Sequence, residues 1–207
     1  MPGRTVGAMT DAMSRTGPLA DGLVLGADGR PRCAWGASAV EYVAYHDEEW
    51  GRPVRGDDAL FERMSLEAFQ SGLSWLTILR KREAFRRAFG GFAIDAVAGY
   101  TDADAARLLA DPGIVRNRMK IAATLHNARV AADLAGGLGA LLWSFAPSPP
   151  RARPVTRADV PATTPESTAM ARELKRRGFR FVGPTTAYAL MQATGMVDDH
   201  LADCHVS

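Results

Sequence analysis

Apolar residues recur at helical spacing along most of the chain, whereas the strict alternation typical of strands is nearly absent. The clearest case follows residue 57, where Leu60, Phe61, Met64 and Ala68 fall on one face of a helix. Further helices are expected over 38–51, 74–89, 101–111, 115–134, 140–145, 164–177 and 185–194. The pattern therefore predicts an all-α fold of about eight to ten helices.

Residues that can cap a helix stand where several of these segments begin. A capping side chain accepts hydrogen bonds from the free backbone N–H groups of the first turn, so it fixes where a helix starts. The expected caps are Ser38 (with Glu41 as a capping box), Asp57 or Asp58, Ser74, Thr101 (with Asp104) and Thr164, which precedes a proline.

Two segments lack the helical pattern. Residues 1–30 show no periodicity, and we expect a poorly ordered N-terminal extension there. Residues 146–161 contain five prolines and are typical of an extended connection. The remainder, residues 31–207, is predicted to form one domain.

Composition narrows the classes of protein that fit. Apolar residues make up 47% and charged residues 23% of the 207, as in ordinary globular proteins. No apolar run approaches the roughly 18 residues that span a bilayer, and the N-terminus has no secretory pattern, so we expect a cytoplasmic protein with no membrane partner. The formal net charge of +2 permits an anionic partner without requiring one.

The two cysteines of the chain each have a histidine at ligand spacing. Cys33 precedes His46 by thirteen positions, and His200 precedes Cys204 by four. Together they would make a Cys2His2 set, the closed tetrahedral environment of a structural Zn²⁺. Two unrelated buried thiols and two ordinary histidines fit the spacing as well, and this alternative stays open.

A candidate binding pocket lies in the first third of the domain. Glu67 is in line with the apolar stripe of its helix, where a carboxylate is costly unless it has a partner or a function. The aromatic residues Trp35, Tyr45, Trp50 and Trp75 flank it in sequence. π faces around one carboxylate suit a flat cationic heterocycle, although core packing and a boundary glutamate would give the same pattern.

A second candidate site is the glycine-centred turn at residues 178–187. A tight turn followed by a helix N-terminus exposes backbone N–H groups that can bind a phosphate. Lys175, Arg176, Arg177 and Arg180 add positive charge beside the turn. A solvated basic face on an ordinary helix connection is the competing interpretation.

Taken in order, five segments resemble one family. They are Cys-Ala-Trp-Gly at 33–36, Tyr-Val-Ala-Tyr-His-Asp-Glu-Glu-Trp-Gly at 42–51, Leu-Glu-Ala-Phe-Gln-Ser-Gly-Leu-Ser-Trp at 66–75, Lys-Arg-Arg-Gly-Phe-Arg-Phe-Val-Gly at 175–183 and Met-Val-Asp-Asp-His-Leu-Ala-Asp-Cys at 196–204. The set is similar to the constitutive 3-methyladenine DNA glycosylases of the helix–hairpin–helix superfamily, over about residues 32–204. Positions 68–69, Ala-Phe, depart from the Gly-Gln found in members of that family.

The resemblance implies a role for each candidate residue. Cys33, His46, His200 and Cys204 would hold a structural Zn²⁺. Glu67 would be the catalytic acidic residue that hydrogen-bonds the extruded base, with Trp75 stacked on that base and Tyr45 and Trp50 in the pocket. Gly183, Thr185 and Thr186 would bind the DNA backbone.

The implied activity is hydrolysis of the N-glycosidic bond of 3-methyladenine in alkylated double-stranded DNA by a monomeric base-excision repair enzyme. Other branches of the superfamily carry a catalytic aspartate where this chain has Asp198. Because the ligand His200 is so near, we expect Asp198 to play a structural part instead. A non-catalytic damage-recognition protein on the same fold, or a glycosylase of wider range, stays an alternative at this point.

Overall fold

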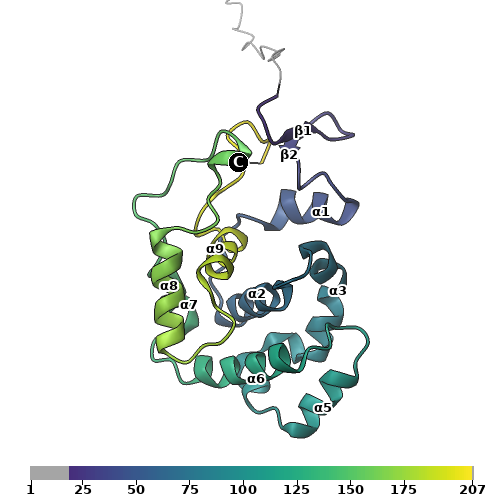
Figure 1. The fold of residues 1–207 in the computed structure, drawn as a ribbon, viewed down its shortest axis with the longest axis vertical. Coiled ribbons are helices and arrows are strands. Elements are labelled where there is room, and N and C mark those ends of the chain that lie inside the picture. The colour runs from purple at the N-terminus through teal and green to yellow at the C-terminus, as the bar shows by residue number, and fades with distance from the viewer. Residues whose placement is uncertain (1–18, 207) are drawn as a thin grey trace, which may run out of the picture.

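The computed structural model describes residues 19–206. Helices dominate it, with α2 at the centre and the other helices around it (Figure 1). The helices are α1 (Val40–Ala44), α2 (Asp57–Gln70), α3 (Trp75–Ala88), α4 (Ile94–Ala98), α5 (Asp102–Ala110), α6 (Arg118–Ala132), α7 (Gly137–Trp143), α8 (Pro165–Arg176) and α9 (Pro184–Ala193). A π-helical turn (Tyr45–Glu49) extends α1, and single 3-10 turns form at Gly90–Phe92 and Arg157–Asp159.

Helix α2 is the core element because both of its sides are covered. It packs against α3, α6, α7 and α9, so Leu60, Phe61, Leu66 and Phe69 are fully buried. Full burial of such a side chain stabilises the fold by roughly 1.5–3 kcal/mol. Glu67 lies on this same buried helix, and the packing therefore fixes the position of its carboxyl group.

Several predicted caps are confirmed and others are wrong. Ser74 accepts from the Thr77 N–H, and capping boxes form at Thr101 and Thr164. Ser38 caps nothing: its hydroxyl donates to the Trp35 carbonyl, and α1 begins later, after Ala39.

The predicted cap of α2 is also wrong, because Asp57 and Asp58 lie inside its first turn and serve other helices. Asp57 accepts from the Leu138 and Gly139 N–H groups at the start of α7. Asp58 accepts from the Ile94 N–H at the start of α4. These bonds tie three helix N-termini together, a tertiary arrangement that local spacing does not reveal.

The N-terminal boundary differs from the expectation. Residues 19–30 were expected to be poorly ordered, but they form β1 (Leu23–Leu25), which pairs antiparallel with β2 (Pro31–Cys33). The hairpin is ordered because Leu23 packs against Cys33, Leu201 and Cys204. The fold is thus helical with one small added sheet, and residues 1–18 lie outside the described part of the chain.

The two ends of the described chain meet beside this hairpin (Figure 1). The His205 N–H donates to the Pro31 carbonyl. Arg153, from the proline-rich connection, donates to the His200, Leu201 and Val206 carbonyls and so fastens the C-terminal segment from its other side. Within residues 19–206, no helix combines the length and apolar character needed to cross a bilayer.

Candidate functional site

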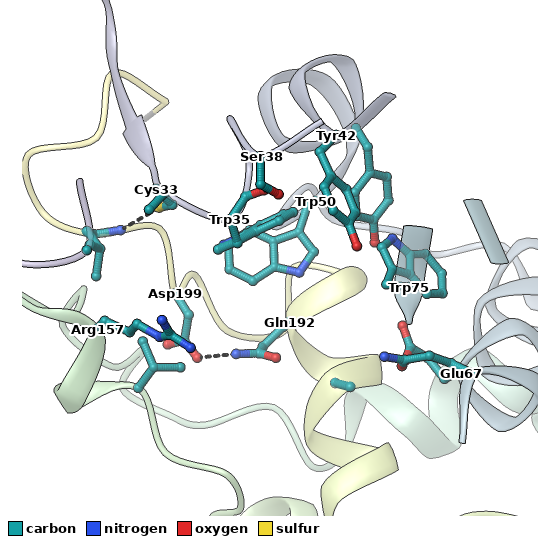
Figure 2. Close-up of a pocket in the computed structure, with 17 residues that line it drawn as sticks. Cys33, Trp35, Ser38, Tyr42, Trp50, Glu67, Trp75, Arg157, Gln192 and Asp199 are labelled. Atoms are coloured by element: carbon teal, nitrogen blue, oxygen red, sulfur yellow. Dashed lines mark hydrogen bonds between the residues drawn. The ribbon is translucent and has the colours of Figure 1, made fainter. Parts of the chain in front are cut away.

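A cavity of about 640 Å³ opens between the N-terminal hairpin, α1, the start of α3 and α9 (Figure 2). Its walls combine aromatic rings with a few polar groups, the usual make-up of a small-molecule site. The residues that line the cavity include Gly22, Trp35, Tyr42, Tyr45, Trp50, Glu67, Trp75, Arg157, Ala189, Gln192 and Asp199.

All four predicted pocket residues line this cavity. Tyr45 begins the π-helical turn that follows α1, and Trp50 follows the end of that turn. Glu67 comes from the buried helix α2, and Trp75 is the first residue of α3, held in place by the Ser74 cap. The roles of these residues stay predictions, but the structure brings them together.

Aromatic rings form a continuous wall. The rings of Trp35 and Trp50 meet edge to face with centroids 4.9 Å apart, and those of Tyr45 and Trp75 lie 5.4 Å apart at a tilt of 44°. The Trp75 indole N–H is buried and has no hydrogen-bond acceptor among residues 19–206. A buried donor of this kind is costly. The wall therefore offers stacking faces to a heterocycle.

Glu67 is the buried acid of the cavity. Only 5% of the residue is exposed, and none of the described residues forms a hydrogen bond with its carboxyl group. Burial raises the pKa of Glu67 to about 8, and the positive charge of Arg63 opposes part of that rise. A cationic ligand would favour the ionised carboxylate, and it would supply the hydrogen-bond partner that none of the described residues provides for Glu67.

The structure adds polar lining residues that the sequence did not single out. Gln192 on α9 and Asp199 beyond it belong to the wall, and Arg157 comes from the proline-rich connection. Gly22 belongs to the segment expected to be poorly ordered. No local motif marks these positions, although Asp199 is the neighbour of the aspartate considered in the sequence.

Asp198 itself is not in the cavity wall. Its Oδ1 lies 2.8 Å from the His200 Nδ1 atom and accepts from the His200 backbone N–H, and Arg153 pairs with its other oxygen at 3.4 Å. This position agrees with the structural part expected for Asp198. The carboxylate of the Asp198-Asp199 pair that faces the cavity is Asp199.

Three of the four predicted metal ligands converge. The ligand atoms of Cys33, His46 and Cys204 all lie within 4.8 Å of one another, and the His46 Nε2 atom is 3.6 Å from the Cys204 Sγ atom. His200 packs edge to face on the His46 ring at 4.8 Å, but its Nε2 atom lies 3.2 Å from the His46 carbonyl instead of joining the group.

Two thiols and an imidazole are ligand types that zinc prefers, and all three residues are buried. Cys33 and Cys204 are both buried and unpaired by a disulfide. The hydrogen bond between the two thiols lowers the pKa of Cys204, which favours its thiolate, the form that binds metals, and raises the pKa of Cys33. Asp47, held by Arg32, lies 2.7 Å from the His46 Nδ1 atom and keeps the Nε2 atom turned toward Cys204.

The predicted DNA-contacting residues lie at the surface, at the start of α9. Gly183 precedes α9, and Thr185 and Thr186 stand in its first turn. Asn127 clamps the turn between α8 and α9 by bonding both backbone groups of Arg180, at 2.9 and 3.0 Å. These bonds hold the turn, and the exposed residues Gly183 and Thr185 stand at the N-terminus of α9, where free N–H groups can bind a phosphate.

Comparison with known proteins gives a consistent result. The family described as methyladenine glycosylase matches residues 35–207. DNA-3-methyladenine glycosylase 1 of Escherichia coli (strain K12) is 41% identical over 177 residues, covering 84% of this chain and 95% of that protein. DNA-3-methyladenine glycosylase of Haemophilus influenzae (strain ATCC 51907 / DSM 11121 / KW20 / Rd) is also 41% identical over 177 residues, covering 84% of this chain and 96% of that protein.

Solved structures agree with the sequence comparison. A crystal structure of a 3-methyladenine DNA glycosylase I variant in complex with 3-methyladenine superposes with a TM-score of 0.80 at 35% identity, covering 84% of this chain and 96% of that one. The matched family begins at residue 35, so β1 and β2 precede it.

Proposed function

This chain belongs to the methyladenine glycosylase family, and from that premise we propose how its cavity works. It is a DNA-3-methyladenine glycosylase, a hydrolase that acts on N-glycosyl bonds in base-excision repair. The observation that carries the proposal is the buried, unpartnered Glu67 carboxyl group in a cavity walled by Tyr45, Trp50 and Trp75.

The chemistry of the substrate explains why this arrangement suffices. Methylation at N3 gives adenine a positive charge in DNA and weakens its N-glycosidic bond. Water attacks C1′ of the deoxyribose and loses a proton, while the N9–C1′ bond breaks and its electron pair leaves with the base. The released 3-methyladenine is neutral, and an abasic site stays in the strand.

Selectivity follows from charge. The extruded base must leave the DNA stack, which costs a few kcal/mol and less for a damaged base. Stacking on Trp75 and the carboxylate of Glu67 favour a cationic ring over neutral adenine. Glu67 acts as the catalytic acidic residue by holding the base as it leaves, with Tyr45 and Trp50 closing the pocket.

The cluster of Cys33, His46 and Cys204 is proposed to hold a structural Zn²⁺, with His200, which packs on the His46 ring, turning from the His46 carbonyl to become the fourth ligand. Four protein ligands leave no position for water, so the ion would add folding free energy and no chemistry. Its ligands come from the N-terminal hairpin, the π-helical turn and the C-terminal segment. The ion would thus hold the turn that carries Tyr45 in register with the end of the chain.

The turn between α8 and α9 is proposed to be the hairpin of a helix–hairpin–helix unit. Backbone N–H groups of Gly183, Thr185 and Thr186 would bind a phosphate of double-stranded DNA, supported by the basic residues at 175–180. We also propose that the protein is a monomer and that it is located in the cytoplasm.

Release of free bases from methylated double-stranded DNA tests the proposal. The purified protein is incubated with the DNA, and the released bases are separated and counted. We expect 3-methyladenine in solution and an abasic site in the strand. Tight binding to the methylated DNA without release would instead favour a damage-recognition protein on the same fold.

A further inference from the structure

The cavity has a second polar wall that the account above does not use. Figure 2 shows Gln192 and Asp199 at one end of the cavity, with Glu67 and Trp75 at the other. Asp199 is only 4% exposed, so the protein keeps a second carboxyl group almost out of solvent beside the site. A buried carboxyl group needs hydrogen-bond donors or a function.

The donors that Asp199 does have lie on one of its two oxygens. Its Oδ2 atom accepts from the Tyr188 hydroxyl at 2.5 Å and from the Gln192 side-chain amide at 2.8 Å. Tyr188 and Gln192 are one helical turn apart on α9, and so they reach the same atom. Arg151 donates to the Tyr188 hydroxyl at 2.8 Å and directs the hydroxyl proton toward Asp199.

The second oxygen of Asp199 is left for the cavity. Residues 19–206 offer no hydrogen bond to Oδ1, and that atom is not among the fully buried polar atoms without a partner. Since Asp199 lines the cavity, the accessible oxygen faces the ligand space.

The bond to Asp199 also fixes which end of the Gln192 amide faces the cavity. A carboxylate accepts only, so the NH2 group must point at Asp199 and the carbonyl oxygen must point away from it. Without this anchor the amide could flip and present NH2 groups instead. Arg157 also lines the cavity, but the acceptor that this hydrogen bond directs into it is the Gln192 carbonyl oxygen, which attracts positive charge.

The two ends of the cavity would meet different parts of one nucleotide. If the base is held at the Glu67 and Trp75 end, as the proposed function requires, the deoxyribose extends from it toward the rest of the cavity. A volume of about 640 Å³ leaves room for both. Positive charge develops on the deoxyribose as the N-glycosidic bond breaks.

We propose that Asp199 is a positioning residue that locks the Gln192 amide with its carbonyl oxygen toward the deoxyribose, where that oxygen stabilises the charge that forms during bond cleavage. Oriented dipoles of this kind act on the transition state because they cost no rearrangement when charge appears. This inference rests on the proposed function.

The test compares three variants in two assays. The first assay is the single-turnover rate of 3-methyladenine release from methylated DNA, and the second is the dissociation constant of free 3-methyladenine. Asp199→Ala should lower the rate by about 10- to 100-fold, because the amide loses its anchor, and leave the free-base dissociation constant within about twofold. Gln192→Met, which keeps the side-chain length, should reproduce this split.

Two controls separate positioning from a general loss of structure. Tyr188→Phe removes one donor to Asp199 but keeps the contact with Gln192, so its rate should stay within about threefold of wild type. The double variant Asp199→Ala/Gln192→Met should be no slower than the slower single variant, because Asp199 acts through Gln192.

Unchanged rates in both single variants, fully additive losses, or a parallel loss of rate and free-base affinity would each overturn the inference. If Asp199→Ala does not fold, Gln192→Met alone decides, and an unchanged rate in that variant refutes the inference. These results are distinct from a failure of the proposed function, in which the wild-type protein itself would release no base.

Discussion

Replacing Glu67 by glutamine should make the protein more stable and less active. The amide has almost the same shape as the carboxyl group but does not ionise in the buried position. Wild-type Glu67 has its pKa raised from 4.5 to about 8 by burial. Between these values the folded state keeps a proton that the unfolded state has lost.

The sign and size of the stability effect follow from this difference. In that window the folded state binds one more proton than the unfolded state, so the free energy of unfolding falls as pH rises, by about 1.36 kcal/mol per pH unit. Glu67→Gln removes this slope. Its free energy of unfolding should exceed that of wild type by roughly 2–4 kcal/mol more at pH 8 than at pH 5.

Activity should move in the opposite direction. A hydrogen bond to a charged group contributes about 1.5–3 kcal/mol, so the single-turnover release of 3-methyladenine should fall by roughly 10- to 150-fold at pH 8. In wild type the rate at sub-saturating protein should rise with pH until about 8, as Glu67 ionises. In the variant this rise should be absent.

The assay pairs urea unfolding with base release at several pH values. Glu62→Gln is a matched control, because Glu62 is on the same helix and pairs with Arg86 at 2.8 Å, outside the cavity wall. Its release rate should equal that of wild type. Parallel stability curves for wild type and Glu67→Gln, or equal release rates, would refute the reasoning.

Three further predictions concern the proposed zinc cluster, the aromatic wall and the N-terminal hairpin. Cys204→Ser should lower the zinc content and the unfolding temperature while base release persists at low temperature; a stable but inactive variant would argue for a catalytic ion. Trp75→Ala should slow release by roughly 5- to 150-fold through lost stacking, whereas Trp75→Phe should retain most of the rate; equal losses would argue against stacking. A chain starting at residue 31 should be less stable than one starting at residue 19 by at least about 1.5–3 kcal/mol, the burial of Leu23; equal unfolding midpoints would contradict this.

The sequence predicted most of the helical segments because their signals are local, but it missed the short helix α4 (Ile94–Ala98). Ser74 and Thr164 cap the helices expected of them, since a cap needs only neighbouring backbone groups. Asp57 failed as a cap because it bonds the start of α7, about 80 positions away in the chain. The strand at Leu23–Leu25 was missed because it is ordered by contacts with the C-terminal segment, not by its own pattern.

The functional site also contains some residues that the sequence could indicate and others that only the tertiary structure reveals. Glu67 and Trp75 could be proposed because a carboxylate in an apolar stripe and a cluster of aromatics stand out in sequence. Gln192 and Asp199 could not, because their importance lies in a hydrogen bond between two segments and in the wall that they share. The placement of His200 outside the Cys33, His46 and Cys204 group could also not be read from ligand spacing.

The central claim is that the cavity lined by Glu67 and Trp75 receives the damaged base. A crystal structure of this protein with free 3-methyladenine tests it most directly. We expect the base stacked on the Trp75 ring, with a polar atom of the base within hydrogen-bond distance of the Glu67 carboxyl group. A base bound elsewhere, or no binding at concentrations that inhibit base release, would contradict it.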